Sequence, residues 1–309
     1  MDFSFSVGHG ADVTVNYILD NFTPALDAIA TAIGFVTDNI QGTLTGIPPT
    51  AGIAILTMLS LWRVGWKFAG FTLLALALVD HMGLWQGTME TLSLVLSATI
   101  IAMVFGIPAG IAMARSDKVA SLFRPVLDLM QTMPAFVYLI PAAMFFGLGA
   151  VPGTIATVIF SMPPVVRLTN LGIRQVHPEF VEAGLAFGCT PSQLLFKVQL
   201  PNAMPSIMAG VNQTIMLSLS MVVIASMIGA GGLGNSVLTG IQRLDVGAGF
   251  EGGLAVVILA VVLDRITQSC GKGSSGFLSF LAFRNGKGRP QSTSSDGAPT
   301  DDEQRSVAA

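Results

Sequence analysis

The stretch Glu182-Ala-Gly-Leu-Ala-Phe-Gly188 is followed, after nine residues, by Val198-Gln-Leu-Pro201, and both lie between apolar segments long enough to cross a membrane. Pro178 favours the start of a helix, because its missing N–H would be unpaired in a first turn anyway. Thr190 before Pro191 predicts the start of a second helix, with the threonine as N-cap. Two short helices joined by a glycine-containing turn would form a compact projecting element.

The first of these helices carries two glycines and two carboxylates. Gly184 and Gly188 are four residues apart, which predicts a smooth face that another protein could approach closely. Glu179 and Glu182 would lie in the first turn, where the helix dipole favours negative charge. A catalytic role for Glu182 is disfavoured, because no second acid, histidine or nucleophile is expected to accompany it in a polar pocket.

The composition indicates an integral membrane protein. Of 309 residues, 52% are hydrophobic and only 11% are charged, whereas soluble domains carry roughly 25% charged residues. Apolar runs of about membrane length predict about seven spans. They cover residues 49–62, 65–79, 91–114, 132–148, 151–168, 207–228 and 253–266. Arg63 and Lys67 favour a hairpin over one kinked pass for the first two, since charge at mid-bilayer is costly.

The distribution of basic residues predicts the orientation. With seven spans and an outside N-terminus, 14 of the 15 lysines and arginines fall on the cytoplasmic side, and only Arg243 falls outside. The same orientation places the 182–201 stretch in the cytoplasm, where ATP is available.

The two ends of the chain differ from the spans. Residues 1–48 lack the basic region and compact apolar core of a secretory signal. Apolar residues recur there at every third or fourth position from Ile18 to Ile40, which predicts an amphipathic helix. The helix would lie on the outer membrane surface or pack against the chain's own spans, and both remain open. Residues 271–309 are expected to be a cytoplasmic, largely disordered tail, which is polar from about Asn285.

A second informative run lies at the predicted span 132–148. Pro134 and Pro141 interrupt it, and such breaks are tolerated where a helix lines a cavity or packs on protein. Gln131 and Thr132 are costly against lipid, so they are expected to face protein or a water-filled path. Met221 suits either a substrate path or core packing. The candidates for a translocation path are Gln131, Thr132, Pro134, Tyr138 and Met221.

These motifs carry a family resemblance. The chain resembles the permease subunit of glycine betaine/proline betaine (quaternary amine) ABC importers. The resemblance is carried by the 182–201 stretch and by the runs at 128–141, 163–176 and 228–234, and it extends over about residues 51–266. Gly184 is a mild departure, because alanine is usual at this position of the family pattern. The resemblance implies an all-α, polytopic type I importer fold. Its permease core would cover residues 81–270, after two additional spans at 49–80, with a coupling loop at 175–205.

The resemblance also implies partners and roles. Two copies of a separate ATP-binding subunit, a periplasmic or lipid-anchored binding protein and a second copy of the permease are expected, in a bacterial inner membrane. Glycine betaine, proline betaine or choline would be the substrate; a different small amine or amino acid is the alternative, and an ion-driven secondary transporter is less favoured. The expected ATPase-coupling residues are Glu182, Ala183, Gly184, Gly188, Leu200 and Pro201.

The chain has no nucleotide-binding motif of its own. The glycine run at 229–234 lacks the preceding strand of a phosphate-cradling loop, and no Walker A sequence occurs. ATP and Mg²⁺ are therefore expected on the partner ATPase. No catalytic residue, bound cofactor, metal or nucleic acid is expected for this chain, whose two cysteines, Cys189 and Cys270, form no metal-binding spacing.

Overall fold

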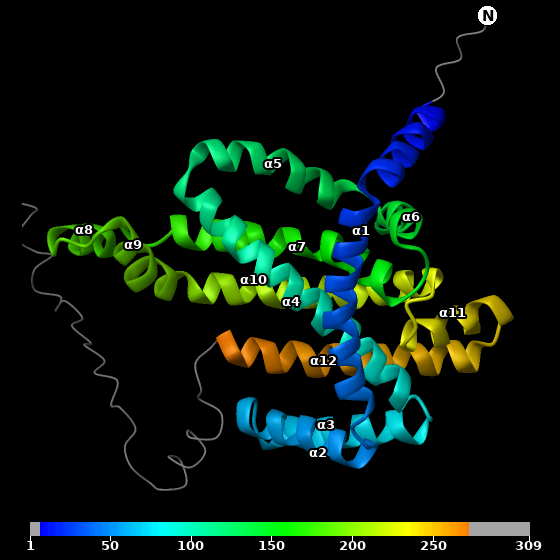
Figure 1. Ribbon diagram of the computed structural model, residues 1–309. Coiled ribbons are helices and arrows are strands. Elements are labelled where there is room, and N and C mark those ends of the chain that lie inside the picture. The colour runs from blue at the N-terminus through cyan, green and yellow to red at the C-terminus, as the bar shows by residue number, and fades with distance from the viewer. Residues whose placement is uncertain (1–6, 272–309) are drawn as a thin grey trace, which may run out of the picture.

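The computed structural model describes residues 7–271, which fold almost entirely into helices (Figure 1). In chain order the helices are α1 (Val7–Thr45), α2 (Pro49–Arg63), α3 (Trp66–His81), α4 (Trp85–Arg115), α5 (Asp117–Thr132), α6 (Ala135–Phe146), α7 (Ala150–Arg174), α8 (Pro178–Ala186), α9 (Pro191–Leu194), α10 (Leu200–Ala225), α11 (Leu233–Arg243) and α12 (Val246–Gly271). The predicted tail at 272–309 lies outside the described residues.

Long apolar helices form the body of the molecule. In Figure 1, α4, α7, α10 and α12 run side by side, with α8 and α9 projecting at one end and α11 at the other. Within residues 7–271, four helices are long and apolar enough to cross a membrane, or up to six if each of two bent pairs counts as one span. The apolar runs of the sequence predicted about seven spans. Two of these runs form α2 and α3, which have 15 and 16 residues and are shorter than the roughly 20 residues that a full crossing needs.

The expected hairpin between the first two apolar runs is confirmed. The helix α2 ends at Arg63 and α3 begins at Trp66, and the two pack together (Figure 1). Inside the hairpin, the Thr72 hydroxyl donates a hydrogen bond to the Ser60 hydroxyl at 3.2 Å. Arg63 and Lys67 therefore lie beside the turn at one end of this pair, and no charge interrupts the middle of either helix.

The interruption expected in the span 132–148 is confirmed at Pro134. The helix α5 ends at Thr132 and α6 begins at Ala135, and the two are bent by 102°. Pro134 causes this break, because proline disfavours a helical conformation in the preceding residue, and Met133 is accordingly extended, with φ −75° and ψ 136°. A bend of this kind is the geometry of a broken span or of a re-entrant loop.

The N-terminal helix packs on the chain's own bundle. Figure 1 shows α1 lying across the long helices, and it contacts α4, α6 and α7. Thr37 is buried in this contact, and Gly34 lies against Val151 of α7. Of the two alternatives left open by the sequence, the structure has packing against the chain's own helices.

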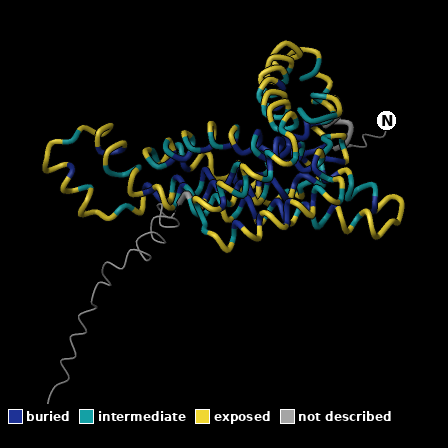
Figure 2. Tube along the Cα trace, turned by 90° about the horizontal axis from the view of Figure 1, so that it is seen from below, coloured by how far each residue is buried: buried dark blue, intermediate teal, exposed yellow. Residues whose placement is uncertain are grey.

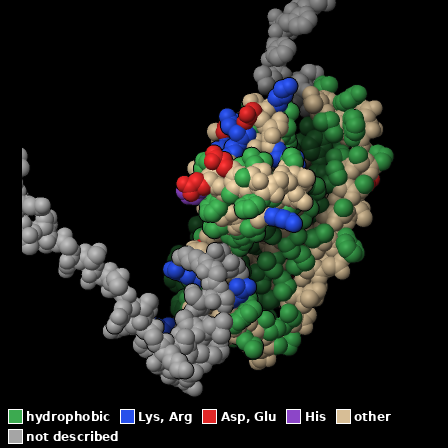
Figure 3. Space-filling model, turned by 90° about the vertical axis from the view of Figure 1, so that its left-hand side faces the viewer, with side chains coloured by type: hydrophobic (Ala, Val, Ile, Leu, Met, Phe, Trp, Pro, Cys, Tyr) green, Lys and Arg blue, Asp and Glu red, His purple; other side chains and the backbone are tan. Residues whose placement is uncertain are grey.

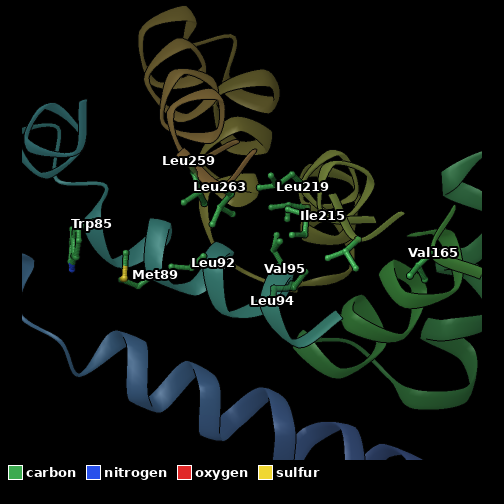
Figure 4. Close-up of a cluster of buried hydrophobic side chains, with 12 residues drawn as sticks. Trp85, Met89, Leu92, Leu94, Val95, Val165, Ile215, Leu219, Leu259 and Leu263 are labelled. Atoms are coloured by element: carbon green, nitrogen blue, oxygen red, sulfur yellow. The ribbon is translucent and has the colours of Figure 1, made fainter. Parts of the chain in front are cut away.

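The core lies where α4, α7, α10 and α12 meet. A β-carbon at Gly110 of α4 would come within 2.7 Å of the Val166 carbonyl oxygen on α7, so only glycine permits this approach. In Figure 4, leucine and valine side chains of α4 point toward Ile215 and Leu219 of α10 and toward Leu259 of α12. Van der Waals packing at small residues is the main attraction between helices in lipid, where apolar burial contributes little.

Two hydrogen bonds attach the outer helix α11 to the bundle. The backbone N–H of Gly232 donates to the Glu90 carboxylate at 3.0 Å, and that of Leu233 donates to the Thr91 hydroxyl at 2.8 Å. Both acceptors belong to α4. Because the first N–H groups of a helix have no partner within it, the side chains of α4 cap α11 from a distant part of the sequence.

Buried residues gather along the middle of the bundle, whereas both projecting ends are mostly exposed (Figure 2).

Candidate functional site

The element formed by α8, α9 and the following π-helical turn Leu195–Gln199 projects from one end of the bundle; we call it the knuckle. The helix α8 begins at Pro178, as predicted. It ends where Gly188, with φ +75°, turns the chain in a left-handed conformation. The backbone N–H of Cys189 then donates to the Gly184 carbonyl at 3.0 Å and closes the turn.

The second part of the knuckle begins with a reciprocal cap. The Thr190 hydroxyl accepts a hydrogen bond from the Gln193 backbone N–H at 3.3 Å, and the Gln193 side chain accepts one from the Thr190 N–H at 2.9 Å. Pro191 occupies the first turn. The N-cap predicted from Thr190 is confirmed, with Gln193 as the additional partner.

Gly184 and Gly188 do not form the smooth outer face that their spacing predicted. Gly184 is buried, and a β-carbon there would lie 2.7 Å from Leu194 Cδ1. Gly188 lies outside the helix and has no atom within 4 Å of such a β-carbon. The smooth outward face predicted from the spacing of these glycines is therefore absent: Gly184 allows the two halves of the knuckle to touch, and Gly188 makes the turn.

The outer surface of the knuckle is apolar and acidic. Four large hydrophobic side chains are exposed there: Phe180, Leu185, Phe187 and Phe196. Phe187 is 88% exposed. Glu179, Glu182 and Ala183 are also exposed. Figure 3, which views this end, shows charged side chains gathered beside hydrophobic ones. Contiguous exposed apolar groups outside a membrane segment mark a surface for another protein.

The base of the knuckle is anchored in the bundle. Leu195 is 2% exposed and packs with Ile173 at the end of α7 and with Ala203 and Ile207 near the start of α10. Leu200 is half-buried and Pro201 is exposed, so both lie at the junction between the knuckle and α10. A force on the knuckle therefore reaches α7 and α10 through packed side chains and a continuous backbone.

Arg174, in the last turn of α7, strengthens this anchor. Its guanidinium donates to the Met113 carbonyl of α4 at 2.7 Å and to the Asn170 side chain at 2.9 Å. It also pairs with Asp117 of α5 at 2.7 Å. Three helices are thus joined just before the knuckle begins.

The five candidates for a translocation path do not form one surface. Gln131, Thr132 and Pro134 are exposed at the break between α5 and α6. Tyr138 is buried, its hydroxyl donates to the Met130 carbonyl at 2.6 Å, and it shares a packed cluster with Met221, which is fully buried. Tyr138 and Met221 therefore pack in the core, and their assignment to the path stays a prediction.

A surface on α10, which was not singled out from the sequence, is a better candidate for the lining of a translocation path. Its exposed residues repeat at three- and four-residue intervals: Pro205, Ala209, Gln213, Met216 and Ser220, with Met227 just beyond the helix. We call this set the α10 stripe. Gln213 and Ser220 are polar, and polar groups in a span favour a protein or water-filled environment over lipid. Helical periodicity could have separated the exposed face of α10 from its buried face, because Met216 and Met221 are five residues apart and therefore lie on different sides of the helix.

Comparison with known proteins identifies the family. Residues 102–270 match the family model described as "Binding-protein-dependent transport system inner membrane component". The chain belongs to this family. It is therefore a multi-span membrane component of a transport system and not an enzyme, and the resemblance stated from the sequence is confirmed.

Close relatives of this inner membrane component are permeases. The chain is 48% identical over 261 residues to the glycine betaine/proline betaine transport system permease protein ProW of Escherichia coli, covering 84% of this chain and 73% of ProW. It is 52% identical over 258 residues to the glycine betaine/carnitine transport permease protein GbuB of Listeria monocytogenes, covering 82% of this chain and 92% of GbuB.

A solved structure supports the fold. An inward-facing form of the MetNI methionine ABC transporter contains a chain that matches with a TM-score of 0.53 at 22% identity, covering 61% of this chain and 93% of that one. This inner membrane component therefore has the expected type I importer fold.

Proposed function

We propose that this chain is the membrane-spanning subunit of an ATP-driven importer for compatible solutes such as glycine betaine, proline betaine or choline. The single observation that carries the proposal is about 50% identity to ProW and GbuB across most of the chain, including the knuckle and the long helices. Both relatives are named as glycine betaine permeases.

In this proposal the knuckle receives force from the ATPase. Two permease copies would pair, and each knuckle would dock on one of two ATP-binding subunits through Phe180, Leu185 and Phe187. Glu182 and Ala183 would contribute to this docking face. Gly184 and Gly188 would maintain its internal shape, and Leu200 and Pro201 would join it to α10. Closure of the ATPase dimer on ATP and Mg²⁺ would move the knuckles and tilt α7 and α10.

The solute would move along the α10 stripe. In a permease pair, the stripe of each copy would face a central path that opens alternately to the two sides. A periplasmic or lipid-anchored binding protein would deliver the solute from outside. The charge distribution supports a cytoplasmic knuckle: Arg115 and Arg174 end α4 and α7 at the end of the bundle that carries the knuckle, whereas Arg243 ends α11 at the opposite end (Figure 1). The N-terminus would then lie outside, and the C-terminus in the cytoplasm.

Reconstitution tests the proposal. The permease would be placed in liposomes with its ATPase and binding protein, and uptake of radiolabelled glycine betaine, proline betaine, choline and carnitine measured with and without ATP. ATP-dependent uptake of at least one quaternary amine supports the proposal. Uptake of a different small amine or an amino acid, or uptake driven by an ion gradient without ATP, overturns it.

A further inference from the structure

A polar pocket lies between the cytoplasmic halves of α10 and α12. Its volume is about 450 Å³. The residues that line it are Pro205, Met208, Ala209, Asn212, Gln213, Thr267 and Gln268. The α10 side of the pocket carries apolar side chains and the amides of Asn212 and Gln213, and the α12 side adds Thr267 and the amide of Gln268. Pro205, Ala209 and Gln213 also belong to the α10 stripe, so the pocket continues the proposed path.

A carboxylate lies next to two of these amides. Asp264 of α12 accepts hydrogen bonds from the Asn212 side-chain amide at 3.0 Å and from the Gln268 side-chain amide at 2.7 and 2.8 Å. Among the described residues, Asp264 forms no salt bridge within 4.0 Å. An ionisable side chain in a membrane span is costly, and its presence in such a position points to a role in binding or transport.

The amides extend the negative potential of Asp264 into the pocket. Because the N–H group of Asn212 donates to the carboxylate, its carbonyl oxygen is directed away from Asp264. That oxygen, Oδ1, is buried and has no hydrogen-bond partner within residues 7–271. A buried acceptor without a partner carries an energetic penalty that a donor or a cation would remove.

We propose that this pocket is a subsite for the cationic trimethylammonium group of the transported solute on the cytoplasmic side of the path. The inference rests on the proposed function and deepens it. A trimethylammonium group is apolar at its surface, positively charged and without an N–H donor. Met208, Pro205 and Ala209 would contact its methyl groups. The negative charge of Asp264, next to the Asn212 and Gln268 amides, would stabilise it through Coulomb attraction.

Direct binding tests the subsite. The complex of this permease with its ATPase, without nucleotide and without the exported binding protein, would be placed in lipid nanodiscs. Equilibrium binding of radiolabelled glycine betaine would then be measured. Asp264→Asn should raise the Kd about tenfold or more, equivalent to about 1.4 kcal/mol. Ala209→Phe, which fills the pocket without touching Asp264, should raise it similarly.

The control is Glu251→Gln, an exposed carboxylate on the same helix and far from the pocket, which should leave binding unchanged. If the wild-type complex does not bind glycine betaine, if both pocket variants bind it like wild type, or if the site binds K⁺ alone, the subsite is wrong. Uptake by the wild-type complex with its binding protein is measured in parallel. Uptake without these binding effects overturns only the subsite, whereas no uptake of any quaternary amine overturns the proposed function.

Discussion

Two parts of the molecule project from the bundle: the knuckle at one end, and α11 with the turn that follows it at the other. They are similar in how far their side chains are exposed, and they differ in how they are attached to the bundle. Each carries a large hydrophobic residue that is 88% exposed, Phe187 in the knuckle and Leu244 after α11. The knuckle is anchored by buried side chains such as Leu195, whereas α11 is held both by the buried side chain of Leu233 and by hydrogen bonds from its start to α4. Exposure alone therefore does not reveal the role of an end; the attachment decides how it can transmit force.

The largest expected effect tests the packing inside the knuckle. Gly184→Leu would force Leu194 away, because even a β-carbon would lie 2.7 Å from it. Overpacking of this kind costs about 1–3 kcal/mol, and we expect ATP-driven uptake to fall by about tenfold to a hundredfold. Uptake by proteoliposomes measures this. Ala186→Leu adds a similar volume at an exposed position of the same helix and should have little effect; equal uptake in both variants would contradict the packing role.

The second prediction compares the two ends directly. Phe187→Ser removes an exposed aromatic group that is expected to dock on the ATPase, so the ATPase should bind about 2 kcal/mol more weakly, in the range of an interface hot spot. Leu244→Ser removes an equally exposed group at the opposite end and should leave ATPase binding unchanged. Co-purification with titrated ATPase measures both. Loss of the ATPase in the Leu244 variant alone would reverse the assignment of the two ends.

The third prediction weakens the attachment of α11. Glu90→Gln replaces a charge-assisted hydrogen bond to the Gly232 N–H with a neutral one, a loss of about 1 kcal/mol. Hydrogen exchange at the Gly232 and Leu233 amides should become about fivefold faster. The Gln193 amide in the knuckle provides the internal control and should not change. Unaltered exchange at the start of α11 would show that the hydrogen bond does not hold this helix.

The smallest expected effect concerns backbone strain beyond α11. Leu244 has φ +55°, the left-handed conformation that costs a residue with a side chain about 1 kcal/mol. Leu244→Gly should therefore be about 1 kcal/mol more stable than Leu244→Ala, since both lose the same exposed contacts. Thermal unfolding of the two purified variants in detergent measures the difference. A less stable glycine variant would argue against strain at this turn.

Local signals in the sequence predicted several elements correctly. Pro178 and Thr190 predicted the starts of α8 and α9, because a missing N–H and a side-chain cap act within one helical turn. Arg63 and Lys67 predicted the hairpin of α2 and α3. Pro134 was expected to interrupt its span, but the bend of 102° depends on how α5 and α6 pack and could not be derived.

Burial by distant segments could not be derived from spacing and residue type. Gly184 was assigned to an outward face, and Met221 was left open between a substrate path and core packing, yet each is buried by a side chain from another segment. The α10 stripe could have been found by comparing Met216 with Met221, since their spacing places them on different helix faces. Which face is exposed, however, depended on the contacts of α10 with α7 and α12.

The sequence by itself determined the membrane character, the family motif and the helix boundaries at caps and prolines, because these follow from solvation and from interactions within a few residues. Only the tertiary structure decided that α1 lies across the bundle, that Gly184 faces inward, and that Asn212 meets Asp264 from 52 residues away. These depend on side-chain packing between helices, where many pairings satisfy the same local pattern and shape complementarity selects among them.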